Sequence, residues 1–418
     1  MGTTNQALIA IGENARAAKG ILGRMGVNEK NAVLKKAAEH MVSDMDGILA
    51  ANERDLENAR NSGLKAAFID RLTLTKKRVE DMAGGLLQVC SLPDPNGEVT
   101  TWTRPNGLII GQKRVPIGVI GVIYEARPNV TADVFGLCFK TGNCCVLRGG
   151  KEALNTNIAV VVAVKKALAE CGVTEHAVSL IEDTSRETAT EFMKLNGYID
   201  VLIPRGGAGL IRSVVENSTV PVIETGTGNC HIYCDKTADF KKAVDIVINA
   251  KTQRPGVCNA AEKLLVHEDI ARDFLPLVCG ELRQKGVEVR ADERARACVP
   301  WAVPAADSDW PTEYEDMIMA VKVVSDTDEA IRHINKYSTA HSEAIITESY
   351  ADSQRFLQEI DSAAVYVNAS TRFTDGFEFG FGAEIGISTQ RLHARGPMGL
   401  KELTTTKYII YGNGQVRG

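Results

Sequence analysis

The stretch VIGVIYEARPNVTADVFGLCFKTGNCCVL, residues 119–147, contains two short apolar runs on either side of a helix-compatible segment. The runs Val119–Ile123 and Cys144–Leu147 have the length and apolar content of buried strands, and Thr131–Lys140 has that of a helix. A strand, a helix and a second strand in this order indicate two parallel strands joined by a crossover.

The same alternation continues toward the carboxyl end. Further strands are predicted at Ala177–Ile181, Val201–Ile203 and Pro221–Ile223, and the helices between them at Asn157–Ala169, Glu187–Leu195 and Leu210–Asn217. Five short apolar strands separated by helices predict a parallel, doubly wound α/β sheet. Because such sheets bind ligands outside the carboxyl ends of their strands, the loops at those ends are the first places to look for a site.

Two further regions surround this sheet. Residues 5–88 have apolar positions at helical spacing and carry no evident chemistry. From about residue 235 a second α/β block begins, with a poorly patterned stretch at 291–311. Its strands are predicted at Leu264–His267, Ile318–Val324, Glu343–Thr347 and Ala364–Asn368, and its helices at Ile270–Gln284, Asp328–Lys336 and Tyr350–Ile360.

Two extended segments lie outside both blocks. Leu108–Val115 is strand-like, and the chain end Thr404–Tyr411 is a candidate partner for it. Together they predict either an arm that pairs with another subunit or a local surface ribbon.

Composition excludes several classes of protein. The 418 residues carry a formal net charge of −5 and no basic run, which argues against nucleic acid or an anionic membrane as the main partner. No stretch approaches 18 uncharged apolar residues, and the first residues lack the pattern of a signal peptide. Ten cysteines without a regular framework favour a reducing, cytoplasmic location over disulfides.

One cysteine is placed differently from the others. In TQRPGVCNAAE, residues 252–262, Cys258 follows Pro255-Gly256 and precedes an Ala-rich run that is compatible with a helix. A thiol at a helix N-terminus is stabilised as the thiolate, and Gly256 would let the backbone approach a substrate. The alternative is a buried structural cysteine, which is the usual state of a free thiol.

Three predicted strand ends carry binding candidates. After the first strand, Asn129 can donate to an oxyanion or simply cap a helix. After the second, Arg148, Gly149, Gly150 and Lys151 form either a nucleotide loop suited to a 2′-phosphate or a solvated turn. After the fourth, Arg205, Gly206 and Gly207 open a helix, as a pyrophosphate site does.

Two other patterns remain open. The segment Cys230–Cys234 contains two cysteines and a histidine, but it alternates like a strand and lacks a second pair at ligand spacing, so no metal site is predicted. Near the end of the second block, Ser370, Thr371 and Arg372 form a candidate anion-binding loop. The phenylalanines that follow either line a pocket or pack beneath their own domain.

Several long motifs in order carry a family resemblance. They are Val115–Asn143, Leu202–Gly209 (LIPRGGAG), Val324–Ile345, Asn368–Phe373 and Leu392–Leu400 (LHARGPMGL). Over nearly its whole length the chain resembles the gamma-glutamyl phosphate reductases (glutamate-5-semialdehyde dehydrogenases) of proline biosynthesis, within the aldehyde dehydrogenase superfamily.

The resemblance implies an aldehyde-dehydrogenase-like fold with three parts. A Rossmann-type nicotinamide-dinucleotide-binding domain would comprise residues 1–103 and 117–234 with 371–400. A catalytic α/β domain, residues 235–370, would carry Cys258, and residues 104–116 and 401–418 would form a β-arm for oligomerisation.

The resemblance also assigns roles to residues. Cys258 would be the nucleophile, and Asn129 with the Cys258 backbone N–H would form the oxyanion hole. Lys151 would favour NADP(H) over NAD, and Glu313 would hold the nicotinamide ribose. Arg127, Ser370, Thr371 and Arg372 are the candidates for binding substrate.

Glu224 falls near the base glutamate of hydrolytic aldehyde dehydrogenases. A reductase must preserve its thioester, so we expect a structural or cofactor-loop role for Glu224 and structural or positioning roles for His333 and His341. The implied reaction reduces gamma-glutamyl phosphate to glutamate 5-semialdehyde and releases phosphate.

Competing interpretations are a CoA-acylating aldehyde dehydrogenase, a hydrolytic one that uses Glu224 as base, and a catalytically silent nucleotide-binding scaffold. The expected partners are the small-molecule substrate, other copies of the chain in a dimer or tetramer, and a separate glutamate 5-kinase.

Overall fold

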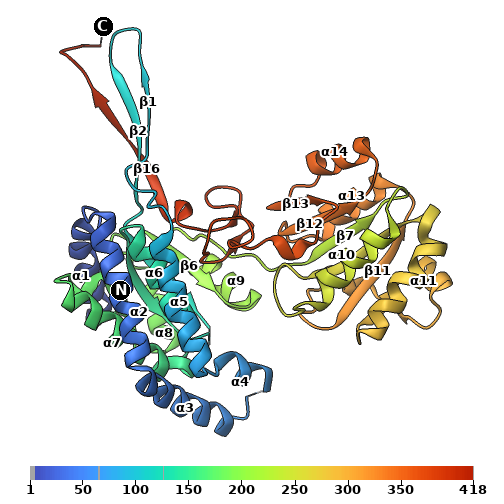
Figure 1. Ribbon diagram of the computed structural model, residues 1–418, viewed down its shortest axis with the longest axis horizontal. Coiled ribbons are helices and arrows are strands. Elements are labelled where there is room, and N and C mark those ends of the chain that lie inside the picture. Colours follow the sequence, from blue (N-terminus) through green and yellow to red (C-terminus); the bar gives the residue numbers. More distant parts are fainter. Residues whose placement is uncertain (1–4, 65, 126, 418) are drawn as a thin grey trace. The chain divides into compact units, whose positions relative to one another are not determined.

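The computed structural model describes residues 5–64, 66–125 and 127–417, and Figure 1 traces the chain. It divides into two compact units. The first unit comprises Met1–Glu224, Gly380–Gly386 and Met398–Gly418, and the second comprises Thr225–Phe379 and Ile387–Pro397. The second unit is therefore inserted into the chain of the first.

The first unit is built on a parallel sheet with the strand order β5-β4-β3-β6. Its strands are β3 (Val119–Tyr124), β4 (Cys144–Arg148), β5 (Val178–Leu180) and β6 (Val201–Arg205). The connecting helices are α6 (Asn129–Lys140), α7 (Leu154–Glu170) and α8 (Arg186–Phe192), and α9 (Ala208–Asn217) follows β6. Right-handed crossovers place α6 and α7 on one face of the sheet and α8 on the other.

Helices from the amino-terminal region complete this unit. They are α1 (Gln6–Leu22), α2 (Val27–Ser43), α3 (Met45–Asn61), α4 (Ala66–Leu72) and α5 (Lys76–Ser91). The first of them packs against β3, β4 and β5, whereas α2, α3 and α5 pack around α6 and α7. The predicted helical region is thus confirmed, as are the first four predicted strands.

The predicted fifth strand, Pro221–Ile223, is wrong. This segment makes only an isolated bridge, between Val222 and Leu202. It runs beside β6 for too short a distance to form a ladder, because the chain leaves the sheet for the second unit at Glu224.

The second unit contains a larger parallel sheet with the order β10-β9-β11-β8-β7-β12-β13. Its strands are β7 (Cys230–Cys234), β8 (Ala261–His267), β9 (Glu288–Ala291), β10 (Val303–Pro304), β11 (Ile318–Val324), β12 (Ser342–Ile346) and β13 (Ala364–Val367). Its helices are α10 (Phe240–Thr252), α11 (Glu268–Gln284), α12 (Glu293–Cys298), α13 (Thr327–Tyr337) and α14 (Tyr350–Glu359). The poorly patterned stretch contains α12, β10 and a short 3₁₀ turn.

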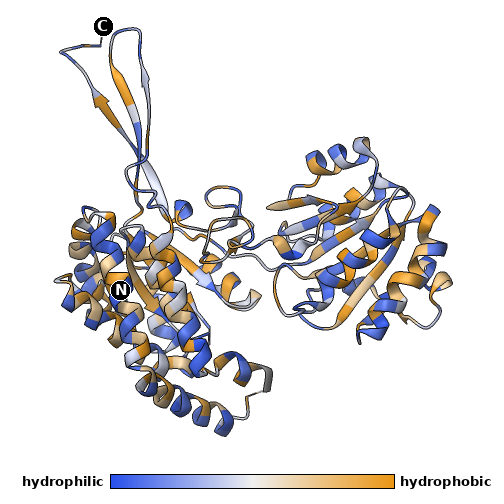
Figure 2. Cartoon of the chain, viewed as in Figure 1, coloured by the Kyte–Doolittle hydropathy of each residue, from blue (hydrophilic) through white to orange (hydrophobic). Residues whose placement is uncertain are grey.

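Alternating side chains are buried on both faces of this second sheet, whose strands include many hydrophobic residues (Figure 2). In β7, Ile232 packs with residues of α10 and α11, and its neighbour Tyr233 packs with residues of α13 and α14. In β8, Leu264 packs on the same side as Ile232, and Leu265 packs on the same side as Tyr233. A sheet covered by helices on both sides explains why these strands appear as continuous apolar runs.

The extended segments form a separate antiparallel sheet, ordered β1-β2-β16. The strands are β1 (Val99–Thr103), β2 (Ile109–Pro116) and β16 (Thr404–Tyr411), and in Figure 1 they project as a ribbon. The predicted pairing of the two segments is confirmed, with Thr404 opposite Pro116 and Tyr411 opposite Ile109. Strand β1 was not predicted. A small antiparallel pair, β14 (Ile387–Ser388) with β15 (Gly396–Pro397), lies near the chain end.

The boundary between the units differs from the one expected from sequence. Residues 225–234, 371–379 and 387–397 belong to the second unit. β7 is a central strand of its sheet, and the 3₁₀ turn Thr371–Phe373 packs against α10 and β12.

Candidate functional site

Cys258 lies in a turn between α10 and β8, and it is half-buried. The expectation that it opens a helix is wrong. Ala261 and Glu262 continue into β8, where Ala261 is fully buried. The N-terminus of a helix therefore does not activate this thiol, and its surroundings have to be considered instead.

The loops that surround Cys258 come from the amino ends of four adjacent strands, in the order β11-β8-β7-β12. Glu313 precedes β11, Cys258 precedes β8, Gly228 and Asn229 precede β7, and Thr339 precedes β12. In a parallel sheet the amino ends of neighbouring strands share one edge, so these four loops are brought together.

The backbone of Cys258 rests directly against Gly228. A Cβ atom on Gly228 would lie 1.4 Å from the carbonyl oxygen of Cys258 and 2.7 Å from its Cα, so a side chain cannot be accommodated there without movement. The same carbonyl oxygen accepts a hydrogen bond from the thiol of Cys230, at 3.1 Å. Two contacts thus fix the position of the Cys258 backbone.

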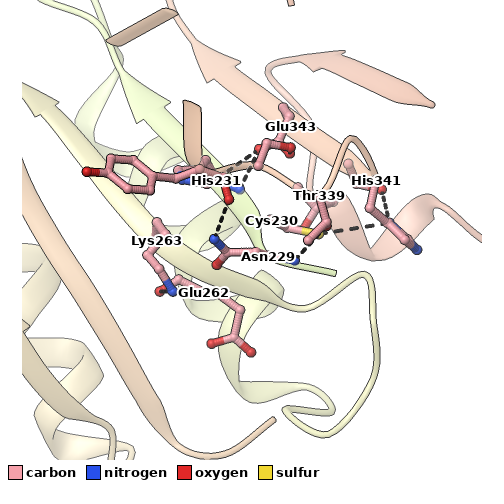
Figure 3. Close-up of polar contacts among 12 residues, drawn as sticks. Asn229, Cys230, His231, Glu262, Lys263, Thr339, His341 and Glu343 are labelled. Atoms are coloured by element: carbon pink, nitrogen blue, oxygen red, sulfur yellow. Dashed lines mark hydrogen bonds and ion pairs between the residues drawn. The ribbon is translucent and has the colours of Figure 1, made fainter. Parts of the chain in front are cut away.

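The segment around Gly228 is held by the loop before β12, the end of α13 and the loop before β11. Figure 3 shows Thr339 beside Asn229. The Thr339 hydroxyl donates to the carbonyl of Thr227 at 2.6 Å and accepts from the N–H of Asn229 at 3.0 Å. The Asn229 side chain donates to the carbonyls of Trp310 and Tyr337, each at 2.8 Å.

Glu313 also contacts this segment. Its Oε1 accepts the N–H of Gly228 at 2.6 Å. Burial raises the pKa of the Glu313 carboxyl to about 7, and the Gly228 N–H acts in the opposite direction.

The candidate anion loop, Ser370–Arg372, packs against the residue after Cys258. The Thr371 hydroxyl donates to the carbonyl of Asn259 at 2.8 Å, and the Ser370 hydroxyl accepts the N–H of Arg372 at 3.3 Å. The Arg372 guanidinium donates to the side chains of Gln253, at 2.9 Å, and Asn259. The Ser370 hydroxyl therefore stabilises the loop itself and the Thr371 hydroxyl ties it to the Cys258 turn, which leaves the cation of Arg372 as the loop's best candidate for holding an anion.

The guanidinium of Arg372 interacts electrostatically with the thiol of Cys258. Burial and then Arg254 lower the pKa of Arg372, while Asp375 and Cys258 act to raise it. A guanidinium that interacts electrostatically with a thiol favours the thiolate, so Arg372, and not a helix terminus, supplies a positive charge that interacts with Cys258.

A buried row of ionisable side chains, which no sequence motif predicted, lies within the same sheet. Glu343, His231 and Lys263 are directly opposite one another on β12, β7 and β8, and all three are fully buried. Glu343 accepts the N–H of His231 at 2.6 Å, and Lys263 donates to the carbonyl of Thr312 at 2.7 Å. Figure 3 shows the row beside Asn229 and Cys230.

Burial disfavours the charged form of each member of this row. It raises the pKa of Glu343 well above the usual range, lowers that of His231 to about 3 and lowers that of Lys263 to about 8. Near this row, Lys251 and Glu262 form a buried ion pair in which Nζ of the lysine is 3.0 Å from Oε2 of the glutamate. The signal in the sequence that could have revealed this row is the presence of polar residues at interior positions of apolar strands.

The two histidines of the family motif are buried. His333 contacts the rings of Trp310, Tyr337 and His231. His341 is fully buried, and its Nδ1 is 2.8 Å from the hydroxyl of Ser342. These contacts fit the structural roles expected for them.

The remaining predicted site residues lie in the first unit, at the carboxyl ends of β3, β4 and β6. Asn129 begins α6 as expected, and its side chain donates to the Asp133 carboxylate at 2.9 Å. Burial raises the pKa of Asp133 to about 6, with Asn129 opposing the shift. Arg127 is exposed in the turn before α6, where its backbone N–H donates to the carbonyl of Glu125 at 2.7 Å.

The loop that follows β4 is positioned by contacts with other parts of the first unit. Arg148 donates to the carbonyls of Thr184 and Ser185 after β5, at 2.5 and 3.2 Å. A Cβ on Gly149 would lie 2.3 Å from the Asn157 side chain, so protein packing is enough to require glycine there. Gly150 and exposed Lys151 lead into a 3₁₀ turn at Lys151–Ala153. The buried Nε of Arg148 has no hydrogen-bond partner, and the loop suits an incoming anionic group.

The glycine turn after β6 opens α9, as predicted. Arg205 ends the strand, Gly206 follows, and Gly207 is the N-cap residue. The N–H of Gly207 donates to the Glu125 carboxylate at 3.1 Å, so a side chain of the protein occupies the place predicted for a pyrophosphate.

The structure thus groups the predicted site residues in two sets. Cys258, Glu313 and the Ser370–Arg372 loop gather in the second unit, whereas Asn129, Arg127 and the two glycine loops gather in the first. Glu224 is half-buried and is the last residue of the first unit before the chain enters the second.

Two further findings concern the described residues. None of their helices is long and apolar enough to cross a membrane. Within the same residues, no group of three or more histidine, cysteine or acidic side chains is placed to hold a metal ion. All ten cysteines are described, and none is in a disulfide.

The first unit has a parallel α/β sheet of the kind that binds nucleotides, and a second α/β unit, with a cysteine in a loop, is inserted into its chain. This combination defines a class of protein. The aldehyde dehydrogenase family model matches residues 2–298 and 296–409, and the chain belongs to this family. The chain is 62% identical to a gamma-glutamyl phosphate reductase of Clostridium beijerinckii and 61% identical to one of Clostridium botulinum, over 98% of this chain and 99% of each relative. A crystal structure of gamma-glutamyl phosphate reductase from Thermotoga maritima has a TM-score of 0.97 at 55% identity, covering 98% of this chain and 100% of that one.

Proposed function

We propose that this protein reduces L-glutamyl 5-phosphate to L-glutamate 5-semialdehyde, with NADPH as the reductant. The balanced reaction consumes the acyl phosphate, NADPH and one proton, and yields the semialdehyde, NADP⁺ and inorganic phosphate. The observation that carries the proposal is the identity of about 60% over 98% of the chain to proteins named for this activity.

The thiol of Cys258 is proposed as the nucleophile. As the thiolate it attacks the acyl carbon, and the C–O bond to phosphate breaks to leave a thioester. The cation of Arg372 favours the thiolate and, with Arg254 near it, provides positive charge for an anionic substrate. The contacts of Cys258 with Gly228 and Cys230 hold its carbonyl group and Cα, and its backbone N–H is proposed as one donor of the oxyanion hole.

The nicotinamide cofactor, when bound, supplies the hydride that converts the thioester to the aldehyde level. As a member of the aldehyde dehydrogenase family, the protein uses a cofactor of this type. We assign its phosphates to the loops after β4 and β6 in the first unit. Lys151, with no acidic residue in the loop before it, supports NADP(H) over NAD.

Asn129 is proposed to complete an oxyanion hole. Its side-chain amide has two N–H groups, and Asp133 takes one of them. An amide N–H is the kind of donor that an oxyanion hole requires.

The test is NADP⁺ reduction with glutamate 5-semialdehyde, with and without inorganic phosphate, on wild type and on Cys258→Ser. Phosphate-dependent turnover that the substitution abolishes is expected, because phosphate must release the acyl group from sulfur. Turnover that ignores phosphate and yields glutamate would instead favour a hydrolytic enzyme with Glu224 as base. Turnover that requires CoA would favour an acylating one.

The proposed partners follow from the same assignment. A separate glutamate 5-kinase in the cytoplasm would supply the unstable acyl phosphate. The ribbon of β1, β2 and β16 is proposed to join copies of the chain into a dimer or tetramer.

A further inference from the structure

The three residues Thr227–Asn229 form a strip of backbone that lies directly against Cys258. Gly228 is in the middle of this strip, and its Cα is too close to the Cys258 carbonyl for any side chain. On either side of it, hydrogen bonds with Thr339 hold the carbonyl of Thr227 and the N–H of Asn229. The peptide N–H of Gly228 itself is held by Glu313, at 2.6 Å.

The carbonyl of Thr227 and the N–H of Gly228 belong to one peptide group, so Thr339 and Glu313 hold this group from its two sides. Glu313 thereby restrains the peptide group that leads directly to the Cα of Gly228, the atom that lies against Cys258. Hydrogen bonds to a charged acceptor are shorter and stronger than neutral ones, so the Glu313 carboxylate is well suited to this task.

From this geometry we infer that Glu313 is a positioning residue for the nucleophile: by holding the Gly228 N–H, its carboxylate fixes the surface on which the Cys258 backbone rests. The inference rests on the proposed function in taking Cys258 as the nucleophile. It adds a task that Glu313 performs in the absence of cofactor. A carboxylate has two oxygens, and the bond from Gly228 uses Oε1, so this task is compatible with a cofactor hydroxyl at Oε2.

The charged groups around Glu313 bear on its protonation. Glu315 and Glu262 act to raise its pKa and Lys263 acts to lower it, while burial has the largest effect. The buried thiol of Cys230 also faces it. Since the pKa of Glu313 lies at about 7, the stronger charged acceptor forms as the pH rises through neutrality.

The test measures attack by Cys258 without any cofactor. The wild type, Cys258→Ser, Glu313→Ala and Glu313→Gln are mixed with p-nitrophenyl acetate, and the burst of p-nitrophenolate is followed. We expect Glu313→Ala to lower the burst rate about tenfold, because a displaced backbone misaligns the thiolate. Glu313→Gln should restore most of the rate near pH 6, since its amide carbonyl still accepts from Gly228, and should lack the rise around pH 7.

Hydrogen exchange supplies a second measurement that does not depend on activity. Backbone amides in residues 225–235 should exchange faster in Glu313→Ala than in wild type, with Glu313→Gln in between. The matched control is Glu281→Ala, a substitution of an exposed carboxylate on α11, which should leave both measurements unchanged.

The outcomes separate the two proposals. If Cys258→Ser keeps the burst, Cys258 is not the nucleophile and the proposed mechanism fails. If Cys258→Ser abolishes the burst but Glu313→Ala retains the full rate and only weakens NADP⁺ binding, the positioning inference is overturned and the proposed function stands.

Discussion

At the scale of single residues, Gly228 is the position where a small change should have the largest effect. Its substitution by alanine places a methyl group inside the van der Waals radius of the Cys258 carbonyl, so the strip, the cysteine or both must move. We predict a loss of at least about 100-fold in kcat for Gly228→Ala, because misplacement of a nucleophile by about 1 Å has effects of that size.

The control for this substitution is Gly280→Ala in the same unit. Gly280 lies in α11, and a Cβ atom added to it would have no atom within 4 Å, so alanine there should stabilise the helix by about 0.5–1 kcal/mol. Steady-state kinetics and thermal unfolding distinguish the two. Wild-type kcat in Gly228→Ala would show that the close contact with Cys258 is absent in solution.

Another prediction concerns His341, whose pKa burial alone lowers to about 4. The unfolded chain binds a proton on this histidine below about pH 6.5, whereas the folded chain does not until about pH 4. The stability contributed by the neutral histidine is therefore present above pH 6.5 and is lost as the pH falls.

Replacing this histidine should reduce that loss. Between pH 7 and pH 5, the free energy of unfolding of His341→Asn should fall by about 2 kcal/mol less than that of wild type. Urea unfolding at the two pH values measures it, and His393→Asn, at an exposed position, should behave like wild type. Equal losses in His341→Asn and wild type would mean that the folded protein protonates this ring.

The sequence made Cys258 a candidate nucleophile, but the prediction of its surroundings was wrong. Alanine and glutamate after it favour a helix by intrinsic propensity, yet in the structure Ala261 and Glu262 are buried in a parallel strand. Long-range pairing with β7 and β11 overrides the local preference there. The row of Glu343, His231 and Lys263 was missed for the same reason, because only the register of three strands brings these residues together.

At the scale of secondary-structure elements, the amino terminus of α9 has a carboxylate from the β3 end as its present partner. Glu125 accepts the Gly207 N–H and so competes for the donors that a pyrophosphate would need. We predict that Glu125→Gln binds NADP⁺ about 2- to 5-fold more tightly, as expected from removing one negative charge near a helix N-terminus.

Isothermal titration of NADP⁺ into the two proteins checks this prediction. Glu216→Gln, near the other end of α9, serves as the control and should bind like wild type. Weaker binding by Glu125→Gln would contradict the competition and would indicate that Glu125 accepts a hydrogen bond from the cofactor.

Short buried strands were the elements that the sequence predicted best. β3, β4, β6 and β11 match their predicted positions to within two residues, since an apolar run between turns has few alternatives. β1 was missed because its threonine-rich sequence is exposed and lacks an apolar pattern. Pro221–Ile223 was overpredicted, because an apolar run does not reveal whether a partner strand extends beside it.

At the scale of the whole molecule, the ribbon of β1, β2 and β16 carries exposed apolar side chains on both faces. Trp102 and Ile410 are both opposite Ile110, which places their side chains on the same face, and the ring of Tyr408 contacts that of Trp102 edge-on. Trp102, Tyr408 and Ile410 are each at least 41% exposed. An exposed apolar face on a projecting sheet is typical of a surface that another protein covers.

We predict that Ile410→Lys lowers the molar mass in solution toward that of a single chain, because a charge would be buried in the proposed interface. Light scattering coupled to size exclusion measures the mass at several protein concentrations. Lys407→Ala on the opposite face is the control. An unchanged mass for Ile410→Lys would show that the ribbon does not join subunits.

The order of the chain also has a consequence for synthesis. The first unit needs Met398–Gly418, since β16 pairs with β2 and the Asn143 side chain donates to the carbonyl of Leu403. On the ribosome, the amino-terminal half must therefore wait for the last residues to emerge, whereas the inserted unit can fold earlier from a nearly continuous segment. The first unit, although translated first, is the later one to be completed, and shortening the carboxyl end would damage it before it affects the loop that carries Cys258.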